Sequence, residues 1–351
     1  MSMLDERNIQ KSIVQILLVF IMISNIVGTT RSYANAFAVQ RTSVLKKQKV
    51  VLSSLAAETD NELESSSTED KKDVPLYLAE GLFAVYKPLE WTSNDVVGYI
   101  RKMLETDARK RGAKVQKRKS KKGFKVGHGG TLDPLATGVI VLGVGSGTKE
   151  LQNYLTGSKK YRAGVELGYE TNTLDLEGNV TMTAPFDFVT EDHIQRVIPS
   201  FIGKIMQVPP IFSAIRKDGK RLYDEARAGK TEDEIEIEPR EVQVYGLEYI
   251  KQDHNGKGLP CFGLNVECGG GTYIRSLVRD IGKSLDTVAT MTSLERTQQG
   301  VFTISDAIPK DEWTVESIYN AIKRSNKARD TIEAQNSQEP SNQIDEKNEV
   351  V

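Results

Sequence analysis

The sequence contains few of the side chains that bind metals or form disulfides. Its 351 residues include two cysteines and three histidines. The histidines are scattered, and no Cys/His group has the spacing of a zinc site. Cys261 and Cys268 stand seven positions apart on a predicted strand, where an odd separation places side chains on opposite faces. We therefore expect no metal site and no disulfide between these two cysteines.

The chain also lacks a strong net charge, with 47 basic and 48 acidic residues and a formal net charge of −1. The balance differs by region, because residues 75–310 contain 33 basic and 30 acidic side chains. This small positive excess is compatible with RNA binding, although many ordinary enzymes share it. The hydrophobic fraction of 38% and the length allow one large domain, or two smaller ones, with tails.

The longest apolar run lies near the N-terminus, where Arg7 and Lys11 precede the stretch from Ile13 to Val27. Residues 32–36, SYANA, then form a small-residue cleavage pattern, which is typical of a secretory signal peptide. A transmembrane anchor is the alternative interpretation. Fifteen helical residues at about 1.5 Å each fall short of a hydrocarbon core of about 30 Å, which favours the signal peptide.

The segment after this run has the composition of a transit peptide, with four basic residues and no acid between Arg41 and Glu58. A signal peptide followed by ANAFA at residues 34–38 and a basic, serine-containing stretch resembles the bipartite plastid-targeting presequence of algae with secondary plastids. We therefore expect residues 1–56 to be a targeting presequence and the protein to reach a plastid. A mitochondrial presequence is the alternative.

Composition also divides the rest of the chain. Residues 57–74 are acidic and rich in Ser and Thr, which predicts a disordered linker before a folded domain at 75–310. A short helical extension is expected at 311–325. Residues 326–351 are rich in Gln, Asn and Glu, which predicts a second disordered segment.

The most unusual motif of the folded domain is GHGGTLDPLATG at residues 127–138, followed by an apolar run. Its glycines allow tight turns and close approach of a ligand, and Pro134 biases Asp133 away from helical geometry. An acid in a rigid turn before a core strand is well placed for catalysis. An Asx-turn that merely caps the loop would have the same sequence features, so both interpretations stand on these residues alone.

Hydrophobic patterns around this motif predict the neighbouring elements. Residues 81–86 read as a buried strand, and Thr92, Ser93 and Asn94 are candidate caps of a helix whose apolar face includes Ile100. Alternation after Lys160 places Tyr161 on the inner face of a strand, where it could line a cleft or be an ordinary core tyrosine. Thr272 can cap a helix with an apolar stripe from Ile274 to Leu285.

Arg275 falls in the first turn of that last helix, where a positive charge opposes the helix dipole. This placement favours an acidic partner or a phosphate nearby, although a solvated arginine would be equally compatible. Residues 109–125 contain ten basic side chains and no acid. They predict a flexible basic loop that could contact phosphates.

Together these segments resemble the TruB family of tRNA pseudouridine-55 synthases, where the number is a tRNA position. The resemblance covers about 230 residues, from Leu76 to Ile304. Its motifs stand in the order of the family: YKP at 86–88 with TSND at 92–95, GH at 127–128 with TLDPLATG at 131–138, KY at 160–161, residues 171–178, SA at 213–214 with Gly219 and LY at 222–223, and GTYIR at 271–275.

The resemblance implies an α+β pseudouridine synthase fold, with a mixed, mainly antiparallel sheet, flanking helices and an RNA-binding cleft. It implies that Asp133 is the essential carboxylate, which attacks the sugar or abstracts its proton before the uracil rotates and re-bonds through C5. Tyr161 corresponds to the ring that stacks on the flipped base and helps remove the C5 proton. Arg275 corresponds to the residue that pairs with the acid, and its charge favours the ionised carboxylate that this chemistry needs.

The same resemblance implies further substrate-binding residues: His128, which aids nucleotide flipping, Tyr273 and Leu294 at cleft positions, and Arg216 and Lys87. The implied substrate is the T-loop uridine in the T-arm of tRNA, modified in an organelle. No cofactor is expected because the reaction is an isomerisation. We also expect no metal, no guide RNA and a monomeric protein.

The sequence departs from the family pattern in four places. Gly129 replaces a hydroxyl residue after the histidine, Arg216 stands where lysine is usual, and Glu295 occupies a position that is usually basic. Nothing after Ile304 resembles an additional RNA-binding module, for which the basic 109–125 loop could substitute in part.

Two other functions remain open. One is the guide-RNA-dependent, dyskerin-like branch of the superfamily, against which residues 213–223 and the organellar presequence both argue. The other is a non-catalytic tRNA-binding chaperone, which would not need the acid. The enzyme hypothesis requires that Asp133, Tyr161 and Arg275 meet at one pocket that is open to solvent.

Overall fold

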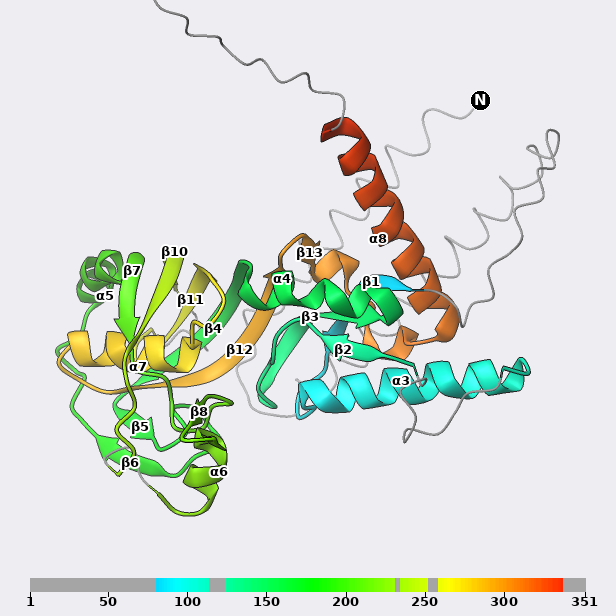
Figure 1. Ribbon diagram of the computed structural model, residues 1–351. Coiled ribbons are helices and arrows are strands. Elements are labelled where there is room, and N and C mark those ends of the chain that lie inside the picture. The colour runs from blue at the N-terminus through cyan, green and yellow to red at the C-terminus, as the bar shows by residue number, and fades with distance from the viewer. Residues whose placement is uncertain (1–79, 114–123, 231–233, 252–257, 337–351) are drawn as a thin grey trace, which may run out of the picture. The chain divides into compact units, whose positions relative to one another are not determined.

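Figure 1 shows the computed structural model of the protein, which describes residues 80–113, 124–230, 234–251 and 258–336. The expected presequence at 1–56, the linker at 57–74 and most of the basic 109–125 loop lie outside these residues. The predictions made for those segments are therefore not addressed by the structure. All described residues belong to the compact unit Asp73–Val351.

The domain is built on a nine-stranded sheet with the order β1-β3-β12-β4-β11-β10-β7, in which β2 also pairs with β3 and β13 with β12. All neighbours are antiparallel except β3 and β12, which confirms a mixed, mainly antiparallel sheet. Two short hairpins, β5–β6 and β8–β9, lie outside it. The strands span Gly81–Lys87 (β1), Val126–His128 (β2), Ala136–Val144 (β3), Lys159–Leu167 (β4), Tyr169–Thr171 (β5), Val180–Thr183 (β6), Gly203–Gln207 (β7), Arg216–Lys217 (β8), Lys220–Arg221 (β9), Arg240–Ile250 (β10), Cys261–Cys268 (β11), Ala289–Gln299 (β12) and Phe302–Thr303 (β13).

Helices flank this sheet, as an α+β fold requires (Figure 1). Within the described ranges, none of them is long and apolar enough to cross a membrane. The α-helices span Ser93–Lys110 (α3), Leu151–Thr156 (α4), Glu191–Val197 (α5), Leu222–Arg227 (α6), Ile274–Ser284 (α7) and Val315–Asn336 (α8). Short 3₁₀ helices span Gly145–Lys149 (η2), Ile198–Phe201 (η3), Ile304–Asp306 (η4) and Lys310–Glu312 (η5).

The strand that follows the GHGGTLDPLATG motif lies at the centre of the fold. Eight of the nine residues of β3 are buried, between β1 on one side and β12 on the other. Gly138 has a φ of +104°, and a Cβ there would lie 2.3 Å from the backbone oxygen of Arg296. Only glycine therefore allows β3 and β12 to approach as they do at this point.

Of the three candidate caps of α3, the structure selects Thr92. Thr92 accepts a hydrogen bond from the Asp95 backbone and Asp95 accepts one from the Thr92 backbone, which completes a capping box. The predicted cap of α7 is wrong. Tyr273 occupies the N-cap position, and no side chain caps the helix. The backbone before α7 is held instead by Gln207, whose side chain bonds both the N–H and the carbonyl of Tyr273.

The C-terminal boundary also differs from the expectation. Helix α8 begins at Val315 and continues to Asn336, so the disordered segment expected from residue 326 does not begin there. Polar side chains of the helix have partners elsewhere in the domain: Asn326 donates to the carbonyl of Glu80 at 3.1 Å, and Arg329 pairs with Glu150 at 2.6 Å. These tertiary contacts stabilise a segment whose composition alone resembles a disordered tail.

The two cysteines lie at opposite ends of β11, and both are free thiols. Cys268 is buried, whereas Cys261 is partly exposed. Burial raises the pKa of Cys268 to about 11, so this thiol stays protonated and unreactive at neutral pH. The expectation that these cysteines do not pair is therefore confirmed.

Candidate active site

The loop between β2 and β3 presents Asp133 with its side chain 36% exposed. Its backbone is held on both sides. Ser93 accepts from the Leu132 N–H at 2.8 Å and donates to the Leu132 carbonyl at 3.1 Å, while Lys87 donates to the carbonyl of Pro134 at 3.2 Å. The carboxylate is thus rigidly placed and reaches solvent, which an acid buried as a turn cap would not do.

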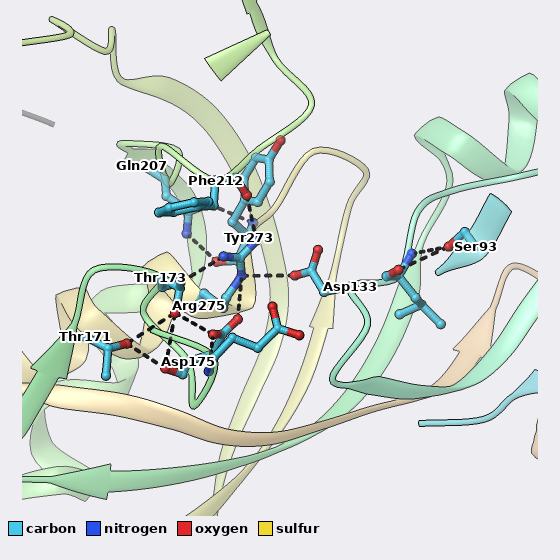
Figure 2. Close-up of polar contacts among 11 residues, drawn as sticks. Ser93, Asp133, Thr171, Thr173, Asp175, Gln207, Phe212, Tyr273 and Arg275 are labelled. Carbon is cyan, nitrogen blue, oxygen red and sulfur yellow. Dashed lines mark hydrogen bonds and ion pairs between the residues drawn. The ribbon is translucent and has the colours of Figure 1, made fainter. Parts of the chain in front are cut away.

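Arg275, near the start of α7, is the nearest partner of this acid (Figure 2). Its Nε lies 3.0 Å from Oδ2 of Asp133, and its own side chain is only 6% exposed. The guanidinium also donates to the carbonyls of Thr173 at 2.8 Å and Phe212 at 3.0 Å. Three segments distant in sequence therefore orient one cation against the carboxylate.

A second acid completes the charge pattern. Oδ2 of the buried Asp175 lies 3.7 Å from Nε of Arg275, so the guanidinium stands between two carboxylates (Figure 2). Asp175 is itself held by the Thr173 hydroxyl at 2.6 Å and by the Glu177 N–H at 3.0 Å. Burial raises the pKa of the neighbouring Glu177, and the negative charges of Asp175 and Asp133 add to that rise. The position of Arg275 in the first turn of α7 favoured an acidic partner, and the structure provides two, Asp133 and Asp175.

Tyr161 lies on the inner face of β4 and is 8% exposed. Its cross-strand partner on β12 is Arg296, a residue that is 1% exposed. The Arg296 guanidinium donates to the carbonyls of Val139 at 2.6 Å and Gly130 at 3.3 Å. Burial raises the pKa of Tyr161, whereas the charge and hydrogen bond of Arg296 act in the opposite direction.

Lys159 is a second buried cation on the face of β4 that carries Tyr161. It is 5% exposed, and its ammonium donates to the carbonyls of Leu155 at 2.7 Å and Gly157 at 2.6 Å. Burial, reinforced by the charge of Arg296, lowers its pKa to about 8. The exposed neighbour Lys160 instead pairs with Glu267 at 3.3 Å on the outer face.

These side chains surround one open pocket of about 400 Å³. That volume is within the range of small-molecule and cofactor sites, roughly 300–1,000 Å³. Five of the eight residues expected at the site line it: Asp133, Tyr161, Tyr273, Arg275 and Leu294. The convergence that the enzyme hypothesis required is therefore met.

The other three predicted residues lie outside the lining of this pocket. Lys87 is fully buried, and its ammonium donates to the carbonyls of Pro88, Trp91 and Pro134. A side chain with no exposed surface cannot contact RNA, so the prediction of a substrate-binding role for Lys87 is wrong. Its three bonds show a supporting role for the loop of Asp133. Burial lowers the pKa of Lys87 to about 8.

His128 ends β2, and Arg216 begins the β8–β9 hairpin. His128 is partly buried and its Nδ1 accepts from the Gly130 N–H at 3.3 Å, while burial and the charge of Arg296 lower its pKa. Arg216 is exposed, and its guanidinium donates to the Gly219 carbonyl at 3.4 Å. Contacts of either residue with a substrate stay predictions, since neither touches the pocket.

Two departures from the family pattern now have structural reasons. A Cβ on Gly129 would lie 2.6 Å from Cβ of Tyr154, so the packing of α4 excludes any side chain at that position. Glu295 accepts a hydrogen bond from the Tyr86 hydroxyl at 2.8 Å on the side of β12 away from the pocket. The basic group of this strand in the pocket is Arg296.

The site contains residues that sequence reasoning missed. Arg296 could have been found from strand alternation, because it shares the face of Leu294, a residue already expected in the cleft. Asp175 lies inside the matched segment 171–178, but no local pattern distinguishes it from its neighbours. Gln207 had no signal at all, because its partner Tyr273 is 66 residues away. Among the described residues, no group of three His, Cys, Asp or Glu side chains could hold a metal ion.

The corrected role of Lys87 can be tested with Lys87→Met. Loss of the ammonium leaves buried carbonyl groups without a donor, so we expect the free energy of unfolding to fall by about 1–3 kcal/mol, measured by urea denaturation. The exposed Arg216→Met serves as control and should change it by less than about 0.5 kcal/mol. A stable Lys87→Met protein that had lost only RNA affinity would restore the direct-contact role.

Sequence comparisons agree with this geometry. Residues 115–274 match the family described as "TruB family pseudouridylate synthase (N terminal domain)". The chain is 45% identical over 245 residues to "Pseudouridylate synthase TRUB1" of Homo sapiens, covering 69% of this chain and 68% of that protein. It is 40% identical over 240 residues to "tRNA pseudouridine synthase B" of Microcystis aeruginosa, covering 68% and 73%.

Among solved structures, the crystal structure of a Cbf5-Nop10-Gar1 complex superimposes with a TM-score of 0.49 at 27% identity, covering 73% of this chain and 62% of that one. The relatives found by sequence are more similar to this chain, at 45% and 40% identity, and the aligned stretches cover 69% and 68% of it. With its matching motifs gathered around one open pocket, the chain belongs to the TruB family of pseudouridine synthases.

Proposed function

We propose that this protein converts the T-loop uridine of tRNA, position 55, into pseudouridine, with Asp133 as the catalytic carboxylate. The observation that carries the proposal is the placement of a solvent-accessible carboxylate 3.0 Å from a buried guanidinium, at a pocket that Tyr161 also lines. Relatives named tRNA pseudouridine synthase B support tRNA as the substrate. Position 55 rests on the resemblance of the motifs.

A uridine inside a folded loop must leave its stack before its glycosidic bond can be reached. Extrusion of a base costs roughly a few kcal/mol. Stacking of the uracil on an aromatic ring such as Tyr161 would return about 1–3 kcal/mol. Tyr161 is suited to this because its ring is already ordered on the inner face of β4, where the residue is 8% exposed, so little conformational entropy is lost on binding.

The chemistry is an isomerisation: the N1–C1′ bond breaks, a C5–C1′ bond forms, the C5 proton leaves and N1 gains a proton. Asp133 either attacks the sugar or removes one of its protons, and both routes need the ionised carboxylate. Arg275 fixes the direction of the carboxylate, because its Nε lies 3.0 Å from Oδ2 of Asp133. Its other bonds, to Thr173 and Phe212, keep it from following the carboxylate out of position.

Removal of the C5 proton falls to Tyr161 in this proposal. Burial keeps the hydroxyl protonated in the free protein, so Tyr161 first gives its own proton to N1 of the released uracil, and its phenolate oxygen then takes the C5 proton. Arg296 stabilises the negative charge on the phenolic oxygen between these two steps. The pair thus combines a ring for stacking with a fixed cation beside the oxygen. Lys159 adds a further positive charge to the same wall of the pocket.

The catalytic assignment is tested with Asp133→Asn, which keeps the shape of the side chain. We expect pseudouridine formation to fall on the order of 10³-fold or more while tRNA affinity is retained, measured by chemical mapping of the product and by filter binding. Arg275 keeps Asp175 as a counter-charge, so the variant should remain folded. Asp187→Asn, exposed and outside the pocket, is the control. Unchanged product from Asp133→Asn would refute the assignment.

The role of Tyr161 is tested with Tyr161→Phe, which keeps the stacking ring and removes the hydroxyl. Turnover should slow by about 10²–10⁴-fold, the usual contribution of a proton-transfer group, while RNA affinity stays the same. Tyr245→Phe, at a ring that is 54% exposed, is the matched control. Full activity in single-turnover assays would remove Tyr161 from proton transfer and leave it only a stacking role.

We further propose that the protein acts in a plastid, with a mitochondrion as the alternative, on the composition of residues 1–56. A fluorescent protein fused to residues 1–60 should co-localise with plastid chlorophyll. A purely cytosolic signal would contradict the organellar proposal, and a mitochondrial pattern would select the alternative.

A further inference from the structure

Three aromatic rings surround the ammonium of Lys310, and neither these rings nor Lys310 lines the pocket of Asp133. Its Nζ lies 3.6 Å from the ring centroid of Tyr99, 4.3 Å from that of Trp313 and 4.8 Å from that of Trp91. The three rings contact one another, with centroids 5.6–5.9 Å apart. A cation within about 6 Å of several ring faces is attracted by each of them.

This Lys310 cage joins three segments that are distant in sequence. Trp91 belongs to the turn after β1 and Tyr99 to α3, while Lys310 begins η5 and Trp313 directly follows it. The C-terminal segment is itself firmly attached to β1. The Ile308 carbonyl accepts from the Tyr86 N–H and from the Trp313 indole, both at 2.9 Å, and the Ile308 N–H donates to the Ala84 carbonyl at 3.1 Å. The cage therefore connects a rigid anchor to the Trp91 turn.

The Trp91 turn, residues 87–93, is the support of the catalytic loop. Lys87 bonds the Trp91 carbonyl at 2.6 Å and the Pro134 carbonyl at 3.2 Å, and the Glu90 N–H donates to the same Pro134 carbonyl at 2.9 Å. On the other side of the acid, the Ser93 hydroxyl donates to the Leu132 carbonyl and accepts from the Leu132 N–H. Any shift of this turn must therefore move the backbone immediately before and after Asp133.

We propose that Lys310 is a positioning residue for catalysis: its ammonium, held by three rings, fixes the Trp91 turn and through it the Asp133 carboxylate against Arg275. The inference rests on the proposed function of Asp133. Displacement of a reacting group by about 1 Å can cost up to roughly 10²-fold in rate, so a brace outside the pocket can act on turnover without touching the substrate. The cage has no need to contact RNA for this effect.

Lys310→Met tests the proposal, because methionine keeps an unbranched apolar chain and removes the charge. We expect the single-turnover rate to fall about tenfold with KM unchanged. Lys310→Arg should restore most of the rate, since a guanidinium also binds aromatic faces. Lys323→Met, an exposed lysine of α8 with the same charge change, is the control and should behave as wild type.

The cage can also be observed directly, because Trp91 and Trp313 are the two tryptophans of the chain. Tryptophan emission should change in Lys310→Met and stay near wild type in Lys310→Arg. Tyr99→Leu is a second variant, which removes the ring nearest the ammonium at a position that is 43% exposed and tolerant of substitution. If Lys310→Met does not fold, Tyr99→Leu takes its place in the test and should show the same loss of rate.

Four results would overturn the proposal: a lower Tm with an unchanged rate in folded Lys310→Met, an equal loss of rate in the Met and Arg variants, an increase in KM alone, or a wild-type rate in Tyr99→Leu. Wild-type protein and Asp133→Asn are measured in parallel. If the wild type makes no pseudouridine, the proposed function fails; if it is active and Lys310→Met equals it, the positioning role alone fails.

Discussion

The ion pair between Arg275 and Asp133 is the interaction on which the rest of the site depends. A guanidinium that is only 6% exposed cannot be left uncompensated, because an unpaired buried charge is strongly destabilising. The fold surrounds it with Asp133, the buried Asp175 and two backbone carbonyls. One of the two acids is sealed inside the protein, whereas the other is half-open to the pocket. Arg275 is therefore neutralised even while Asp133 is engaged with a substrate.

Positioning of the acid requires more than this pair. The loop of Asp133 would be mobile if its backbone polar groups faced water, and the Trp91 turn prevents this by bonding the residues on both sides. Lys87 has the central place in that arrangement, with three carbonyl partners and no exposed surface. Two buried cations, Lys87 and Arg296, thus hold the backbone around the site from opposite sides of β3. Their charges also raise the positive potential at a pocket that must receive an anionic polymer.

The sequence allowed much of this to be predicted, where the signal was local. Alternation placed Tyr161 inward, the capping pattern located the start of α3, and the motif around Asp133 indicated the loop that carries the proposed catalytic acid. Local reasoning failed where a partner lies far along the chain. Lys87 was expected to touch RNA because the resemblance implied it, and only the fold shows that it lies beneath the loop. Gln207 was missed for the same reason, since its partner Tyr273 is brought beside it only by the fold. Arg296 was overlooked although strand alternation placed it on the face of Leu294.

The sequence by itself determined the family and, through that resemblance, the type of sheet, because the order of the motifs and the residues within each motif can be read along the chain. Tertiary structure decided which charges are buried, which of two adjacent lysines faces the pocket and where the last helix ends. Burial and ion pairing depend on contacts between residues such as Glu150 and Arg329, which are far apart in the chain. The free energy of such contacts exists only once the chain is folded, and no pattern within a single segment encodes it.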